Sequence, residues 1–184
     1  MRAWICVAML AAAPAHAQNI DYPTLFEQNA DQVIIDDEGD KLRRRLEMPG
    51  GVTLYSVGEG ATARFAGFDQ SGMMAVGCTA KLVIDLLRAD TACESVFTPA
   101  ERDQLTSLLD RVVAFSARNA VPRVDAPVER ARIDTAIAAD AGQCQANMVN
   151  SARLFGDQFL AEDTQAEIER SLATDRLPVS LPCL

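Results

Sequence analysis

The sequence predicts an α+β fold in which a small N-terminal antiparallel β-meander packs on a mainly helical C-terminal part braced by two disulfides. Between residues 42 and 68, apolar and polar side chains alternate between glycine-containing turns, a pattern typical of short antiparallel strands. From residue 79 onward, apolar side chains recur at the spacing of amphipathic helices. The cysteines expected to form the disulfides are Cys78, Cys93, Cys144 and Cys183.

Residues 1–17 are expected to be a secretory signal peptide, and residues 18–184 a single α+β domain. Arg2 provides a positive start, an apolar run follows, and Ala15-His16-Ala17 matches a small-x-small cleavage site before Gln18. The apolar run of roughly 10 residues is shorter than the ~20 residues that span a bilayer. The mature protein is therefore expected to have no membrane span.

The expected location is the periplasm or the extracellular space. An even number of cysteines in the mature chain suits an oxidising compartment, where such cysteines form disulfides. None of the five asparagines lies in an N-glycosylation motif, which favours a bacterial periplasm. The cysteines form no C-x-x-C pair and the mature chain has no histidine, so a zinc site is disfavoured.

Geometry selects one pairing among the four cysteines. Cys78 and Cys93 flank a predicted helix over residues 79–89, which rises about 16 Å. The four residues after this helix could bring the two cysteines within disulfide reach, roughly 7 Å between Cα atoms, only if fully extended. A helical hairpin of residues 99–119 with the following helix would bring Cys144 near Cys93. We therefore expect Cys93–Cys144 and Cys78–Cys183 bridges.

Loss of the signal peptide would exclude whole classes of chemistry. It would remove the only histidine and the only tryptophan, so catalysis by a serine–histidine–carboxylate triad is excluded. The remaining chain would have 16 basic and 26 acidic residues, a balance that opposes binding to nucleic acid or to anionic membranes. We expect no nucleic-acid partner.

The N-terminal part of the mature chain predicts a short helix followed by an acidic loop. The helix begins near Tyr22, with Pro23 in its first turn. Its expected buried side chains are Phe26, Ala30, Val33 and Ile34. The loop Asp36–Asp40 fits neither register of an EF-hand, because glycine and the acidic residues fall at the wrong positions. A solvated loop is the expectation, and an irregular calcium site is the alternative.

The predicted meander has strands over residues 42–48, 52–57 and 62–68. Alternation places Arg43 and Arg45 on one face of the first strand and Arg44 on the other, together with Leu46. We interpret the arginines as a solvated face with Arg44 snorkelling from the apolar side. Contact of this arginine run with an anion or an acidic partner is the alternative.

The remaining sequence predicts helices and an extended tail. Thr98 and Glu101 form a capping box that opens a helix over residues 99–119. One long helix is expected after Pro127, weakened or split by Gly142 and Gly156. Its expected apolar stripe consists of Ile133, Ile137, Cys144, Met148, Phe155 and Phe159. A second capping box at residues 164–167 predicts a last short helix, and Cys183 is expected to anchor the tail.

No residue pattern identifies a catalytic, cofactor-binding or metal site, so no cofactor is expected. Ser71 lacks the G-x-S-x-G context of a nucleophile elbow, and a Ser-x-x-Lys motif before Lys81 is ruled out by Cys78. A pair of carboxylates that hydrolyses a glycosidic bond stays open as an enzymatic alternative, although no specific pair stands out.

The sequence thus favours an exported, non-catalytic binding or interaction protein of the cell envelope, whose partner is an unknown envelope or secreted protein. The alternatives are a carboxylate-dependent hydrolase acting on an envelope glycan and a small-ligand carrier. An open cleft with two close carboxylates would indicate the hydrolase, and an apolar cavity would indicate the carrier. An exposed apolar patch would indicate the interaction protein.

Overall fold

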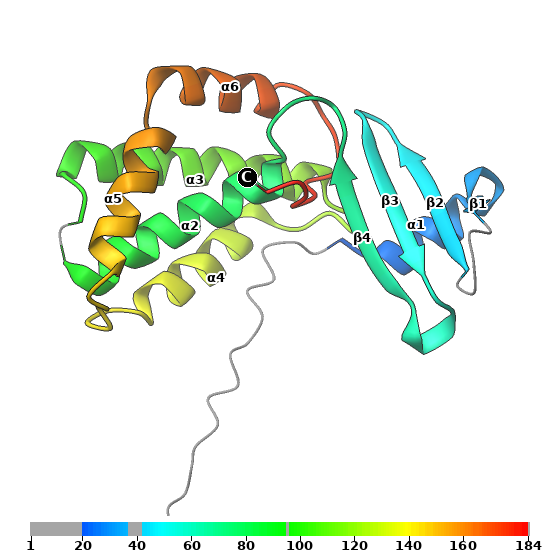
Figure 1. The fold of residues 1–184 in the computed structure, drawn as a ribbon, viewed down its shortest axis with the longest axis horizontal. Helices are drawn as coiled ribbons and strands as arrows, with labels where there is room; N and C mark the ends of the chain where they lie inside the picture. Colours follow the sequence, from blue (N-terminus) through cyan, green and yellow to red (C-terminus); the bar gives the residue numbers. More distant parts are fainter. Residues whose placement is uncertain (1–19, 37–41, 95, 184) are drawn as a thin grey trace, which may run out of the picture.

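The structure is a computed structural model that describes residues 20–36, 42–94 and 96–183. An antiparallel sheet with one short helix lies at one end, and a group of longer helices lies at the other (Figure 1). This arrangement confirms the predicted α+β class. The expected cleavage site and most of the acidic loop lie outside the described residues.

The elements follow one another from a mixed N-terminal part to a helical C-terminal part. The N-terminal part contains α1 (Tyr22–Gln28), the 3-10 helix η1 (Ala30–Gln32), β1 (Ile34–Asp36), β2 (Arg43–Met48), β3 (Val52–Val57), η2 (Gly60–Thr62) and β4 (Arg64–Asp69). The helical part contains α2 (Val76–Cys93), α3 (Pro99–Asn119), α4 (Ala126–Ala138), α5 (Met148–Phe159) and α6 (Glu162–Leu172).

The four strands form one sheet in the order β1-β2-β3-β4, and all neighbours are antiparallel. The turn between β2 and β3 contains Gly50 and Gly51 at φ of 77° and 80°, a conformation that glycine adopts without a Cβ clash. Strand alternation directs Leu46 and Leu54 toward α1, where both side chains are fully buried. The meander is therefore confirmed, with a fourth strand added at its edge.

That edge strand, β1, corrects the expectation that Ala30 and Ile34 lie on the buried side of a helix. Helix α1 ends at Gln28, and both Ala30 and Ile34 are exposed. Ile34 instead pairs with Arg45 across the sheet. The run Val33-Ile34-Ile35 is β-branched, and such side chains fit a pleated strand better than a helix.

The hydrophobic core has two clusters, one under the sheet and one among the helices. In the helical cluster, Leu105, Leu108 and Phe115 of α3 are fully buried. The capping box predicted at the start of α3 is confirmed, with the Thr98 hydroxyl accepting from the Glu101 backbone N–H at 3.3 Å. Helix α2 is longer than expected and contains Cys78 and Cys93 near its two ends.

Both predicted disulfides are present. Cys93 is bonded to Cys144 with a Cα–Cα distance of 4.6 Å, and Cys78 to Cys183 with 5.2 Å. The second bridge fixes the extended tail, which runs between β4 and α2 (Figure 1). Val179 in this tail is fully buried in the sheet cluster, so the tail belongs to the core as well as being tethered.

The long helix expected after Pro127 is split near Gly142, one of the two glycines expected to weaken or split it, into two helices, α4 and α5. They are separated by residues 139–147, where Gly142 has a φ of 73° that ends the helical path. Cys144 lies exposed in this connection rather than on an inward helical face. Phe155, which was expected in the core, is 56% exposed. The break between α4 and α5 interrupts the helical periodicity that had placed Phe155 in one stripe with Ile133.

The second predicted capping box is also wrong. Helix α6 begins at Glu162 with Ala161 at its N-cap, so Thr164 lies inside the first turns of the helix. Glu162 and Asp163 occupy the first turn, where negative charge stabilises the free N–H groups. The expected apolar residue Ile168 is fully buried.

Candidate functional site

A groove of about 510 Å³ lies between α1 and the sheet. Its walls come from α1, the η1–β1 segment, the inner face of β2 and β4, and the turn that leads into β4. The side chains that line it are mostly apolar, with one cation and one acid. They belong to Pro23, Phe26, Glu27, Ala30, Val33, Ile35, Arg44, Gly60, Ala63 and Phe65.

A local cap begins α1, and contacts with distant segments hold the helix over the sheet. The Asp21 carboxylate caps the helix by accepting a hydrogen bond from the Thr24 backbone N–H at 3.1 Å. The backbone N–H of Asp21 donates to the Val121 carbonyl at 2.7 Å. The ring of Phe65 from β4 lies 6.1 Å from that of Tyr22 and 5.8 Å from that of Phe26. These aromatic contacts hold one wall of the groove against the other.

Arg44 is the cation of the groove. The register of the sheet places it in one row with Ile35, Ser56 and Phe65 on the inner face. Its guanidinium lies over the ring of Phe26, 6.0 Å from the centroid, and its Nη2 donates a long 3.4 Å hydrogen bond to the Ser56 hydroxyl. Its Nε is buried, and within the described residues it has no hydrogen-bond partner.

Arg45, the next residue, has a different electrostatic environment on the opposite face of the strand. Its Nε, like that of Arg44, is buried and has no hydrogen-bond partner among the described residues, but its Nη1 lies 3.2 Å from the Glu47 carboxylate, so its charge is paired. Arg44 forms no ion pair with a carboxylate in the described part of the chain, and Glu27 is the exposed acid among the groove residues. Neighbouring arginines therefore differ in whether the protein itself neutralises them.

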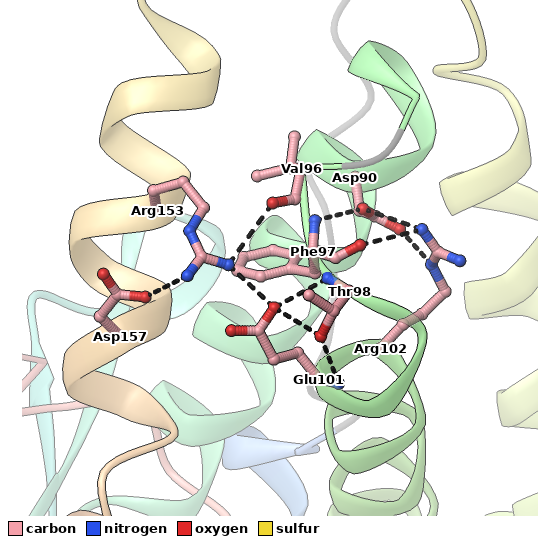
Figure 2. A network of polar contacts seen from close by, with 8 residues as sticks. All are labelled: Asp90, Val96, Phe97, Thr98, Glu101, Arg102, Arg153 and Asp157. Carbon is pink, nitrogen blue, oxygen red and sulfur yellow. Dashed lines mark hydrogen bonds and ion pairs between the residues drawn. The ribbon is translucent and has the colours of Figure 1, made fainter.

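A second polar centre surrounds the turn between α2 and α3 (Figure 2). Glu101 accepts from Arg153 at 2.9 Å and from the Thr98 backbone N–H at 2.7 Å. These contacts lower the pKa of Glu101 from its ordinary value of 4.5 to about 2, with the Arg153 hydrogen bond as the largest cause. Arg153 also donates to Asp157 at 2.6 Å. Two carboxylates, those of Glu101 and Asp157, share the Arg153 guanidinium, and these contacts join α5 to the turn.

Asp90 completes the same centre on its other side. One carboxylate oxygen accepts from the Phe97 backbone N–H at 2.9 Å, and the other from Arg102 at 2.5 Å. The residue is 6% exposed. A carboxylate held this way stabilises the turn between α2 and α3.

A cleft of about 440 Å³ between α2, α3 and α4 is lined by acidic residues and could therefore hold a hydrolytic carboxylate pair. Three acids line it: Asp90, which is bonded to Arg102, Asp134, which accepts from Arg130 at 3.0 Å, and Glu94. Asp90 and Asp134 are engaged with arginines of the same cleft. The hydrolase alternative therefore has one further acid in this cleft, Glu94, beside two that are held by arginines.

The cysteines and Ser71, which the sequence analysis considered as candidate site residues, make contacts that stabilise the fold. The four cysteines form the two disulfides. The Ser71 hydroxyl donates to Asp69 and accepts from the Met73 backbone N–H at 3.2 Å, as in a loop turn. Within residues 20–36, 42–94 and 96–183, no group of three or more histidine, cysteine or acidic side chains is arranged to hold a metal ion.

Sequence reasoning did not predict the groove itself. Phe26 was expected to be buried, but its contact with Phe65 joins elements far apart in the chain. The one available signal was Arg44, a charged residue at an apolar position of an alternating strand. A charge on the apolar side of a strand indicates either a snorkelling side chain or a ligand contact.

Comparisons with known proteins identify no family: no family profile, curated protein or solved structure matches the chain. Among the described residues, no helix is both long enough and apolar enough to cross a membrane. The disulfides fit an exported protein in an oxidising compartment.

Proposed function

We propose that this protein is an exported, non-catalytic binding protein of the cell envelope that carries a small ligand, the alternative that an apolar cavity favours, and that the groove between α1 and the sheet is its binding site. The observation that carries the proposal is a largely apolar groove of about 510 Å³ in which Arg44 is the one cation among the described lining residues. Ligand sites in proteins commonly have volumes of roughly 300–1,000 Å³, an apolar lining and a few polar groups.

The proposed location is the periplasm or the extracellular space, after cleavage between Ala17 and Gln18. Two disulfides support an oxidising compartment, since such bonds persist there and are rare in the cytosol. The formal net charge of −9 argues against nucleic acid as the partner.

An envelope or secreted protein is the second candidate for the binding partner. The observation that favours it is an exposed apolar pair on α5, with Leu154 61% and Phe155 56% exposed. Exposed neighbouring apolar side chains are a feature of protein interaction sites. This pair lies on the helical part of the molecule, so it can be tested separately from the groove.

Titration with the neutral apolar dye N-phenyl-1-naphthylamine tests the groove directly. The oxidised protein is expected to raise the fluorescence of the dye in a saturable manner. Ala63→Trp, which places a large ring at the groove wall, should abolish this rise, whereas Ala131→Trp on the exposed side of α4 should not. Dye binding that is absent, or equal in both variants, would contradict the assignment of the site.

A further inference from the structure

The chemistry of the groove indicates a class of ligand, because Arg44 is a half-buried cation that forms no ion pair with the described residues. Buried N–H donors are almost always hydrogen-bonded, and a charge removed from water without a partner is destabilising. Yet the Nε of Arg44 has no partner among the described residues, and its Nη2 makes only the long contact with Ser56. An anion in the groove would supply the missing acceptors.

The geometry of the guanidinium favours a carboxylate. The guanidinium carbon lies 6.0 Å from the centroid of the Phe26 ring, and a planar guanidinium pairs with two carboxylate oxygens through parallel hydrogen bonds. A single arginine and the acid Glu27 line the same groove, so a ligand with one negative charge is better matched than a dianion.

The other side chains that line the groove indicate that the rest of the ligand is apolar. Beside Arg44, the groove presents the rings of Phe26 and Phe65 and the branched side chains of Val33 and Ile35. Such a surface is favourable to an alkyl or other apolar chain, and offers few hydrogen bonds for sugars.

We propose that the groove binds a small amphiphile with one carboxylate, of the fatty-acid class, whose head pairs with Arg44 and whose chain lies along Phe26 and Phe65. This inference rests on the proposed function, since it names the ligand class of the same groove. It also assigns Arg44 as the residue that distinguishes an acid from the corresponding alcohol.

Displacement of the bound dye by decanoate and by decanol tests the inference, since the two differ in the carboxylate and share the chain length. The oxidised protein is expected to bind decanoate more tightly than decanol. Arg44→Gln should weaken the affinity for decanoate roughly tenfold or more, because a charge-assisted hydrogen bond is lost. The affinity for decanol should not change. Arg45→Gln, on the other face, is the matched control and should alter neither affinity.

Two further results complete the test. Glu27→Gln should tighten decanoate binding and leave decanol unchanged, because it removes a negative charge from the groove. Thermal melting of each variant confirms that it is folded, and Arg44→Lys, which keeps the charge, should restore part of the preference for the acid. Equal binding of acid and alcohol, or insensitivity to Arg44→Gln, would overturn the ligand class while leaving the groove as a site. Failure of the dye itself to bind would overturn the proposed function.

Discussion

The guanidinium of Arg176 and the carboxylate of Asp69 form an ion pair that is closed to solvent, with side chains 0% and 1% exposed. The Nε–Oδ2 distance is 2.6 Å. Arg176 also donates to the Ser171 carbonyl at 2.6 Å and to the Met74 carbonyl at 3.0 Å. The pair therefore connects the end of β4, the loop before α2 and the segment after α6, and it joins the sheet to the helices.

Removal of one partner of this pair is expected to destabilise the protein strongly. Asp69→Ala should lower the free energy of unfolding by about 3–5 kcal/mol, because it leaves the Arg176 charge buried and unpaired. Urea denaturation measures the change. The control is Asp175→Ala, which removes the acid of an exposed pair with Arg118 and should cost at most ~1 kcal/mol. Equal effects of the two substitutions would contradict the assigned role.

Acid should weaken the contact between α5 and the turn before α3. Hydrogen bonds from Arg153 and Thr98 hold the pKa of Glu101 at about 2, below the ordinary 4.5 of an unfolded chain. Its contribution to stability is therefore complete above pH 4.5 and is lost as the pH falls toward 2. Melting temperatures of wild type and Glu101→Gln measured across this range should converge at low pH. A constant difference would show that Glu101 does not supply this dependence.

The packing around Gly156 predicts an unusual response to alanine. Replacement of a glycine in a helix interior by alanine normally raises the free energy of unfolding by about 0.5–1 kcal/mol. Here an added Cβ would overlap the ring of Phe97, which is 2% exposed and has little room to move. Gly156→Ala should therefore lower the free energy of unfolding by about 1–3 kcal/mol instead.

A double substitution identifies that clash as the cause. Phe97→Leu removes the ring edge that an added Cβ would meet. In the Phe97→Leu background, Gly156→Ala should cost less than it does in the wild type, or should stabilise. Additive effects in thermal melts would show that the two sites do not interact.

The two disulfides are expected to contribute unequally. The Cys78–Cys183 bond joins residues 105 apart and the Cys93–Cys144 bond residues 51 apart. In the chain-entropy account, replacing both cysteines of a bond by serine costs about 5 kcal/mol for the first and about 4 kcal/mol for the second. Denaturation of the two double-serine variants tests the order. The reverse order would mean that native-state packing around the tail outweighs loop entropy.

The sequence was informative wherever local chemistry decides structure. The capping box at Thr98 and Glu101, the alternation through Arg44 and Leu46 and the glycines after Pro49 all predicted what the structure contains. The disulfide pairing followed because a helix separates Cys78 from Cys93, although Cys144 itself was expected in a helix and lies in a connection.

The features that sequence reasoning missed depend on contacts between distant segments. Strand β1 exists because Ile34 and Ile35 pair with β2 across a loop, and periodicity alone fitted a helix equally well. The buried pair of Asp69 and Arg176 spans more than half of the chain. The groove likewise needs α1 to fold back over the Phe65 side of the sheet.

If the groove between α1 and the sheet binds a carboxylate-bearing amphiphile, the ligand can be located on the protein. Two-dimensional amide NMR spectra of the isotopically labelled protein, titrated with decanoate, provide this location. We expect chemical-shift changes confined to residues 22–35, the strand around Arg44 and residues 60–65, with the largest changes absent in Arg44→Gln. Shifts centred on Leu154 and Phe155 of α5, or no saturable shifts at all, would contradict it.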